Sequence, residues 1–241
     1  MHGGDGLAFV IQLDPNGTSA LGENGGQMGF GGIRNSLAIG RKPRKLLFSV
    51  SSKSNSKAVN YLAFDIWSNP SEDKLLADHV SIQSKGFAPN DALEPGLLGM
   101  PRPHSLADGK IHLVRILFHN GLQTQYLNSL VASPSLLPFL LGNGEHMHIG
   151  SLTVFLDEGV ASDTPLLTIP INLSILLKLP ADKAFVGFTA STGKQFAKHD
   201  ILSWVMCDQD PCSPALVSEF DYHQQSEFSS ATTQNSVSYY P

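Results

Sequence analysis

Oxygen-bearing side chains gather in one stretch of this chain, from Asp65 to His79. Asp65 and Asn69 lie four residues apart with Trp67 between them, and further acids precede the histidine. A hard cation such as Ca²⁺ binds about six to eight oxygens, which a strand end followed by an acidic loop can supply. The candidate oxygen ligands are Asp65, the Trp67 carbonyl, Asn69 and Asp73, while His79 suits a softer ion such as Mn²⁺. A solvated acidic turn without a metal explains the same composition, so the pattern alone leaves both interpretations open.

Two glycine-rich stretches offer groups that a polar ligand could use. Asp5 stands between glycines at the start of an expected strand, where its carboxylate can accept hydrogen bonds from ligand hydroxyls. An ordinary turn aspartate is the competing interpretation. Residues 25–32 are rich in glycine but lack the G-x-G-x-x-G spacing and the following helix of a dinucleotide-binding loop. Glycine there is better explained by positive φ angles or by a close approach of the backbone.

These groups must be positioned by β-strands, because short apolar or alternating runs recur along the chain. Each run has about five to eight residues, the length of a strand rather than of a helix. The runs cover residues 7–13, 61–67, 79–83, 111–118, 152–156, 184–190 and 201–206. Turn residues punctuate them, and only residues 170–179 suggest a short helical turn. The pattern predicts an all-β fold, an antiparallel sandwich or barrel.

Composition excludes several classes of protein. The 241 residues suit one large domain or two small ones, with 15% charged residues and a formal net charge of −5. An isoelectric point near 5.9 disfavours a nucleic-acid-binding protein. No apolar run is long enough to span a membrane, so we expect no membrane insertion. Two cysteines, Cys207 and Cys212, are too few for a disulfide framework or a four-cysteine zinc site.

Two segments stand apart from the expected strands. Six Lys or Arg residues and no acidic residue lie between Gly40 and Ala58, in a block rich in serine. We expect residues 40–56 of this block to be weakly structured. The tail over residues 207–241 is rich in Ser, Gln and Thr without periodicity, which favours disorder. The sequence therefore predicts one domain over residues 1–206 followed by a disordered tail.

Several short motifs occur together, in one order, and resemble the L-type (legume) lectin family. They lie at residues 4–9, 35–39, 64–67, 79–82, 108–115, 154–157, 170–174, 187–193 and 199–204. The resemblance covers about residues 3–206 and implies an antiparallel jelly-roll β-sandwich of the concanavalin A-like kind. It also implies a non-enzymatic domain that binds glycans or glycoproteins at a shallow site beside paired Ca²⁺ and Mn²⁺ ions. A homo-oligomer through the back sheet and a secretory or extracellular location follow from the same resemblance, although no signal peptide precedes Met1.

The resemblance also assigns roles to single residues that would touch the sugar. Asp5 resembles the family's sugar-binding aspartate, and Gly26 lies in the loop whose backbone N–H meets the sugar. Asn69 resembles the asparagine that contacts both Ca²⁺ and sugar. Phe196, within a variable loop at residues 194–198, is a candidate for stacking on the sugar, as is Phe87.

The metal ligands implied by the resemblance fall in the acidic stretch described first. Asp65 resembles the carboxylate that bridges both ions, and Trp67 resembles the aromatic residue that offers its carbonyl. Asp73 matches the second acid, with Asp78 as a rival because the loop length differs. His79 stands at the position of the histidine that binds the transition metal.

The chain departs from the family pattern at one strand. The family runs Asn-Ser-Leu-Ala-Ile/Val-Glu-Phe-Asp without a break, whereas here Ile39 is followed by an insertion of about residues 40–62 and the motif resumes at Ala63. Ala63 stands in place of Glu, a transition-metal ligand, so we expect Mn²⁺ binding to be weakened while Ca²⁺ binding persists. Residues 35–39 and 59–67 compete for one strand position, and we expect the second near the site. The chain also starts at the Asp5 motif, so strands that precede it in the family are expected to be missing.

Two other functions compete with sugar binding. A degenerate lectin-like module without sugar binding is the main alternative, because the strand of the metal site is interrupted. A glycoside hydrolase needs two carboxylates across a cleft, and no paired glutamate pattern is present. Asn16 and Asn172 begin glycosylation sequons that matter only if the chain enters the secretory pathway. His146 and His148 alternate on one expected strand face, where exposed side chains are favoured over a metal site.

Overall fold

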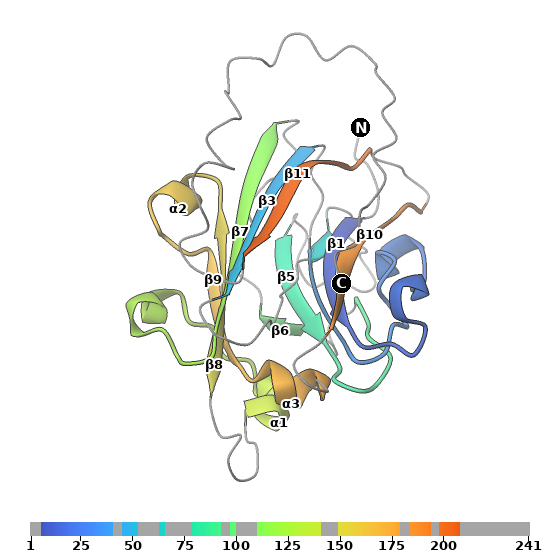
Figure 1. Ribbon diagram of the computed structural model, residues 1–241, viewed down its shortest axis with the longest axis horizontal. Coiled ribbons are helices and arrows are strands. Elements are labelled where there is room, and N and C mark those ends of the chain that lie inside the picture. Colours follow the sequence, from blue (N-terminus) through green and yellow to red (C-terminus); the bar gives the residue numbers. More distant parts are fainter. Residues whose placement is uncertain are drawn as a thin grey trace.

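Two facing β-sheets form the body of the protein, shown as a computed structural model in Figure 1. The structure describes residues 6–40, 45–52, 63–65, 79–92, 97–99, 110–140, 149–178, 184–193 and 198–207. The six-stranded sheet has the order β10 (Phe185–Ser191), β1 (Gly6–Gln12), β2 (Ser36–Gly40), β4 (Ala63–Asp65), β5 (His79–Ser84) and β6 (Leu97–Gly99). The five-stranded sheet has the order β11 (Asp200–Cys207), β3 (Lys45–Ser52), β7 (Ile111–His119), β8 (Gly150–Leu156) and β9 (Leu167–Ile171). The predicted all-β sandwich is confirmed.

The core lies between the two sheets. Phe9 of β1, Ile116 of β7 and Leu152 of β8 belong to one cluster of fully buried apolar side chains that both sheets share. Every residue of β1 and of β8 is buried, so these strands are covered on both faces. The sequence of β1 is almost continuously apolar, whereas β8 also buries Ser151 and Thr153. Each buried Leu, Ile or Phe side chain contributes about 1.5–3 kcal/mol of transfer free energy, which makes this cluster the main source of stability.

In the described part of the chain, helical structure is confined to short segments between the strands. The 3-10 turns are η1 (Gly17–Ser19), η2 (Gly25–Gln27), η4 (Thr124–Ser129) and η5 (Pro134–Leu136), and the α-helices are α1 (Leu137–Leu140), α2 (Glu158–Ala161) and α3 (Leu173–Leu177). The expected helical turn in residues 170–179 is α3. Asn172 begins it, because its side-chain oxygen accepts a hydrogen bond from the Ile175 N–H at 3.1 Å. Lys178 ends it in the left-handed conformation.

One strand position of the six-stranded sheet is built from two separate pieces of chain. β2 and β4 both lie between β1 and β5. Along β5, from Ser84 to His79, the successive partners are Leu37, Ala38 and Ile39 from β2 and then Ala63, Phe64 and Asp65 from β4. The chain therefore leaves this position after Gly40 and returns at Ala63 without a slip in register. The two segments that competed for one position in the sequence share it end to end.

The register also shows which residue follows Ile39 at this strand position. Ile39 pairs with Ile82, and Ala63 pairs with the next residue along β5, Ser81. Ala63 thus follows Ile39 in the sheet although the two are far apart in sequence. A one-residue slip would have turned every side chain to the opposite face, so register of this kind is strongly specified in a buried sheet.

The basic block contains a strand, which corrects the prediction that residues 40–56 are weakly structured. β3 lies between β11 and β7 and pairs with both in parallel (Figure 1). Its partners run from Ile111 to Phe118 on one side and from Asp200 to Cys207 on the other. The physical reason is local: the charges of the block stand at its two ends, and the run Leu46–Val50 between them is largely apolar and suits a strand. Parallel pairing requires a long connection between neighbouring strands, and between β3 and β7 the chain passes through β4, β5 and β6 of the other sheet.

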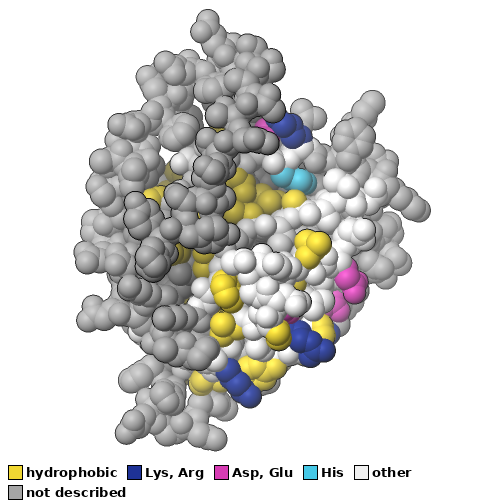
Figure 2. Space-filling view, turned by 45° about the vertical axis from the view of Figure 1, so that its right-hand side comes forward, with side chains coloured by type: hydrophobic (Ala, Val, Ile, Leu, Met, Phe, Trp, Pro, Cys, Tyr) yellow, Lys and Arg dark blue, Asp and Glu magenta, His cyan; other side chains and the backbone are white. Residues whose placement is uncertain are grey.

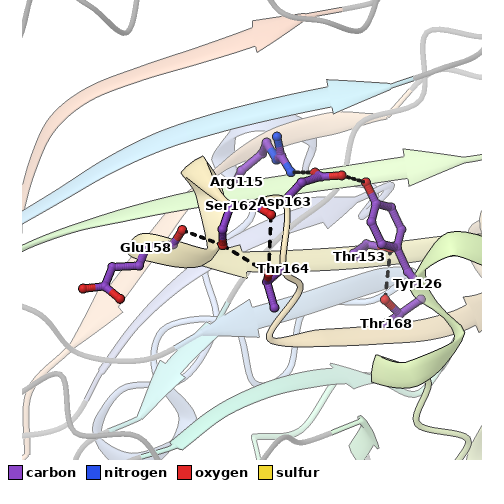
Figure 3. A network of polar contacts seen from close by, with 8 residues as sticks. All are labelled: Arg115, Tyr126, Thr153, Glu158, Ser162, Asp163, Thr164 and Thr168. Carbon is purple, nitrogen blue, oxygen red and sulfur yellow. Dashed lines mark hydrogen bonds and ion pairs between the residues drawn. The ribbon is translucent and has the colours of Figure 1, made fainter.

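A polar network covers the outer face of the five-stranded sheet (Figure 3). The Arg115 guanidinium of β7 lies 3.8 Å from the ring centroid of Phe155 on β8 and pairs with the Asp163 carboxylate. The Tyr126 hydroxyl of η4 donates to the same carboxylate at 2.8 Å, and its ring meets Phe155 edge to face. Asp163 thereby joins the segment after α2 to η4. The network fixes two loops onto strands whose other face is the core.

Candidate functional site

Four strands of the six-stranded sheet form one row of paired residues that includes two predicted site residues, Asp65 and His79. Gly6 at the start of β1 pairs with Asp65 at the end of β4 and with Ser191 at the end of β10. Asp65 in turn pairs with His79 at the start of β5. Strands lie about 4.8 Å apart, so the row from Ser191 to His79 spans about 14 Å. The backbone thus places Asp65 and His79, two predicted metal ligands, at directly opposed positions.

Most of the other predicted site residues lie outside the described part of the chain. Asp5 directly precedes Gly6 of the row, and Trp67, Asn69 and Asp73 follow Asp65. Phe196 belongs to the connection between β10, whose last residue is in the row, and β11. The remaining residues named earlier that lie outside it are Asp78, His146, His148 and Cys212. Their roles stay predictions.

Gly26 lies in a loop that is hydrogen-bonded to the same end of β10. The Ser191 hydroxyl donates to the Gly25 carbonyl, and the Thr189 hydroxyl donates to the Met28 carbonyl at 3.0 Å. Because Gly26 is in the first turn of η2, its N–H has no partner inside that turn. The loop therefore brings a backbone donor close to the row through contacts with Ser191 itself.

Glycine is required at one position of this loop. Gly29 has φ +74°, a backbone conformation that residues other than glycine rarely adopt. A Cβ atom there would stand 3.1 Å from the Ala190 carbonyl oxygen and 3.2 Å from Thr189. The glycine content of residues 25–32 is thus explained by both predicted causes, a positive φ angle and a close backbone approach to β10.

A second set of contacts holds the other side of the loop and was not foreseen from the sequence. The Gln27 side chain donates to Asp91 at 3.0 Å and accepts from the Ala92 N–H at 3.0 Å. Asn90 and the loop also exchange backbone bonds, since the Gly32 N–H donates to the Asn90 carbonyl at 2.8 Å. More than sixty residues separate Gln27 from Asp91. No local pattern signals such a contact, because it depends on how the β5–β6 loop returns past the sheet.

Phe87, one of the two candidates for sugar stacking, lies away from the row. It follows the far end of β5, and Ser84 is about 17 Å along that strand from His79. Its ring is 40% exposed, but the Lys178 ammonium stands 3.9 Å from the ring centroid. This cation–π contact occupies a ring face that a sugar would need. The structure therefore disfavours Phe87 as part of this site.

Charged side chains are few on one face of the molecule. On the face seen in Figure 2 the described side chains are mostly uncharged, and some of the basic groups lie beside an acidic group. Among the residues whose surroundings are described, no three His, Cys, Asp or Glu side chains gather around one point. Such a surface suits recognition by hydrogen bonds more than by net charge.

Comparison with known proteins bears directly on the family. The family model for the legume lectin domain matches residues 144–220. The resemblance to the L-type lectins is confirmed. An L-type lectin-domain containing receptor kinase, SIT2, of rice (Oryza sativa subsp. japonica) is 25% identical over 214 residues, which are 88% of this chain and 25% of that protein. The chain thus spans about a quarter of the length of this L-type lectin relative, and the family match extends past residue 206, where we expected the domain to end.

Proposed function

We propose that this chain is a non-enzymatic lectin domain that binds glycan hydroxyls at a shallow, Ca²⁺-assisted site at the Gly6 end of the six-stranded sheet. The observation that carries the proposal is the row Ser191–Gly6–Asp65–His79 together with the Gly26 loop bonded to Ser191. These are separate parts of the lectin resemblance, drawn from five segments of the sequence, and they meet at one edge. The family match supports a lectin role in general.

The chemistry of such a site suits a sugar. A pyranose hydroxyl is both a donor and an acceptor. The Asp5 carboxylate, one residue from the row, would accept from two hydroxyls, while the Gly26 N–H and the Asn69 amide would donate. Because the loop of Gly26 is tied to β10 and to residues 90–92, its donor is positioned before the ligand arrives, which lowers the entropy cost of binding.

The residues available fit Ca²⁺ better than a transition metal. Asp65, Asn69, Asp73 and the Trp67 carbonyl would hold Ca²⁺, which would supply a fixed positive charge that orients the sugar-binding Asp and Asn. His79 pairs with Asp65 in the sheet and would face a Mn²⁺ ion. Ala63, two residues before Asp65, brings no ligand atom where the family has Glu. We therefore propose Ca²⁺ as the working ion and a weakened or lost Mn²⁺ site.

The degenerate module is the second candidate, and the split strand favours it. The part of the row that carries Asp65 is β4, a segment of three residues that rejoins the sheet after a long excursion. A short segment of this kind can lose its register more easily than a long strand. Sugar binding would then be absent although the rest of the sandwich is folded.

A glycan array separates the two candidates. We expect Ca²⁺-dependent binding that is lost with a chelator and with Asp5→Ala, while the exposed Glu158→Gln on α2, at the opposite sheet, leaves it unchanged. Folded protein that binds no glycan with Ca²⁺ present would favour the degenerate module. Binding that survives both the chelator and Asp5→Ala would refute the proposed site.

The setting in which the domain works is also a proposal. The lectin match and the receptor-kinase relative support an extracellular or membrane-associated location, with glycans or glycoproteins as partners. Within the described part of the chain, no helix has the length and apolar character that crossing a membrane requires.

A further inference from the structure

Two N-glycosylation sequons occur in this sequence, and the structure gives them different surroundings. They are Asn16-Gly17-Thr18 and Asn172-Leu173-Ser174. Asn172 is 8% exposed, and its side-chain oxygen caps α3 by accepting from Ile175. Asn16 is exposed, in the turn that leads into η1, and its side chain makes no capping bond to that turn. The folded domain has room for a glycan on the exposed Asn16, whereas a glycan on the buried Asn172 would disturb the start of α3.

Side-chain hydrogen bonds from Gln12 and Asp14 hold the turn that carries Asn16. The Asp14 carboxylate accepts from the Asn16 N–H and from the Arg34 N–H, each at 2.9 Å. The Gln12 side chain donates to the Gly17 carbonyl at 2.6 Å. These hydrogen bonds fix the backbone of the sequon through the Asn16 N–H and the Gly17 carbonyl. The Asn16 side chain therefore projects from a turn of defined conformation.

Glycine suits the middle position of the sequon in this turn. Gly17 has φ +55°, and a Cβ atom there would stand 3.2 Å from the ring of Phe185. A larger residue would both strain the backbone and press on β10. The sequon and the turn are thus compatible with each other, and Thr18 is exposed beside them.

A glycan on Asn16 would stand at the end of the sheet opposite to the proposed sugar site. Asn16 follows the Gln12 end of β1, whereas the row lies at the Gly6 end, about 20 Å away along the strand. Phe185, beside Gly17, is at the start of β10, and Ser191, in the row, is at its end. An attached glycan at Asn16 would leave the proposed site open.

We propose that Asn16 is an N-glycosylation site of this protein and that Asn172 is not. In the reaction the Asn16 side-chain amide nitrogen forms a bond to the anomeric carbon of an oligosaccharide donor linked to a lipid diphosphate. The bond from that carbon to the phosphate oxygen breaks, the lipid diphosphate leaves with the electron pair, and the amide loses one proton. The proposal rests on the proposed extracellular setting but not on sugar binding.

The test is the intact mass of the protein expressed behind a secretion signal in eukaryotic cells, before and after treatment with an N-glycosidase. We expect one glycan on the wild-type chain and on Asn172→Gln, and none on Asn16→Gln. Thr18→Ala should lose the glycan while leaving Asn16 in place, and Thr18→Ser should keep it. Material retained inside the cells is measured in the same way, so poor secretion does not obscure the result.

Two outcomes would overturn the proposal. One is wild-type protein at the bare polypeptide mass, and the other is a glycan that persists on Asn16→Gln. Glycan-array binding of Asn16→Gln is measured beside the mass. Equal binding by this variant and the wild type is expected from the separation along β1, whereas lost binding would contradict the placement of the glycan away from the site. The mass answers the question even if no glycan on the array is bound.

Discussion

The two sheets of this protein differ in how their central strands are built. In the five-stranded sheet β7 and β8 are continuous strands that pair over six positions, and β8 continues the ladder to β9. In the six-stranded sheet the position between β1 and β5 is shared by β2 and β4, and β3 of the other sheet lies between these two segments in the chain. The stability of the domain and the proposed site therefore depend on different parts of the fold.

The two sheets also differ in the contacts that hold loops against them. Arg115, Asp163, Tyr126 and Phe155 tie two loops to the continuous strands (Figure 3). The proposed site lies at the end of the interrupted strand, where the Gly26 loop is held by hydrogen bonds to β10. We therefore expect changes in the first region to alter the free energy of unfolding and changes in the second to alter ligand-dependent properties.

The largest effect is expected for Phe155→Ala. Phe155 is fully buried and contacts both the Arg115 guanidinium and the Tyr126 ring. Removing a buried aromatic ring costs about 3–5 kcal/mol, which chemical denaturation will measure as a lower free energy of unfolding. Leu127→Ala, at a 45% exposed position of η4, is the control and should change it by less than about 0.5 kcal/mol. Equal effects of the two changes would contradict the assignment of stability to this region.

A proline in β3 is expected to lower the free energy of unfolding nearly as much. β3 pairs on both sides, so Leu47→Pro removes a backbone donor from the middle of the sheet and costs on the order of 3 kcal/mol. Leu47→Val keeps the backbone donor and suits a strand, so it should cost much less. Thermal unfolding of the two variants distinguishes them. If Leu47→Pro leaves the Tm unchanged, β3 is not a paired strand of the five-stranded sheet.

Calcium should stabilise the interrupted sheet selectively. An ion that binds only the folded state at a concentration 100 times its Kd adds about 2.7 kcal/mol, seen as a higher Tm. We expect this gain in the wild type and its loss in Asp65→Asn. Phe155→Ala should keep the gain at its own lower Tm, because its site is intact. A Ca²⁺ response that Asp65→Asn retains would remove Asp65 from the proposed site.

The smallest effect is expected for Asp163→Asn. Its carboxylate is half exposed, so losing the pair with Arg115 should cost only about 1 kcal/mol. Glu158→Gln, exposed on neighbouring α2, removes the same charge without an ion pair to Arg115 and should cost less.

Asp163→Asn should also change the titration of Tyr126. Burial raises the pKa of Tyr126 above its ordinary value of 10.0, and the hydrogen bond to Asp163 raises it further. The folded state thus holds this proton more tightly than the unfolded state, so the stabilisation is complete below pH 10 and is lost as pH rises through the folded-state pKa. Ultraviolet titration against Tyr126→Phe should show a lower pKa in Asp163→Asn that still exceeds the ordinary value. An unchanged pKa would show that the hydrogen bond does not act on it.

Much of the fold could be predicted from local sequence. The alternation in residues 111–118 predicts β7, and residues 170–179 predict the short helical turn that is α3, because both depend on neighbouring residues. β3 is not predicted, because the basic and serine-rich composition of residues 40–56 favours a solvated segment and the apolar run within it is short. The Gln27–Asp91 bond could not be predicted, since it joins loops that only the folded sheet brings together.

Residue type and local spacing are enough to predict the strand-rich fold class, and the resemblance to the L-type lectins rests on short motifs and implies that Ala63 stands where the family has Glu. Long-range strand pairing is what makes β2 and β4 share one strand position, takes β3 to the other sheet, and aligns Gly6, Asp65, His79 and Ser191 in one row. Strand pairing joins residues that are distant in the chain, and its register is set by the burial of whole faces. No local pattern contains that information.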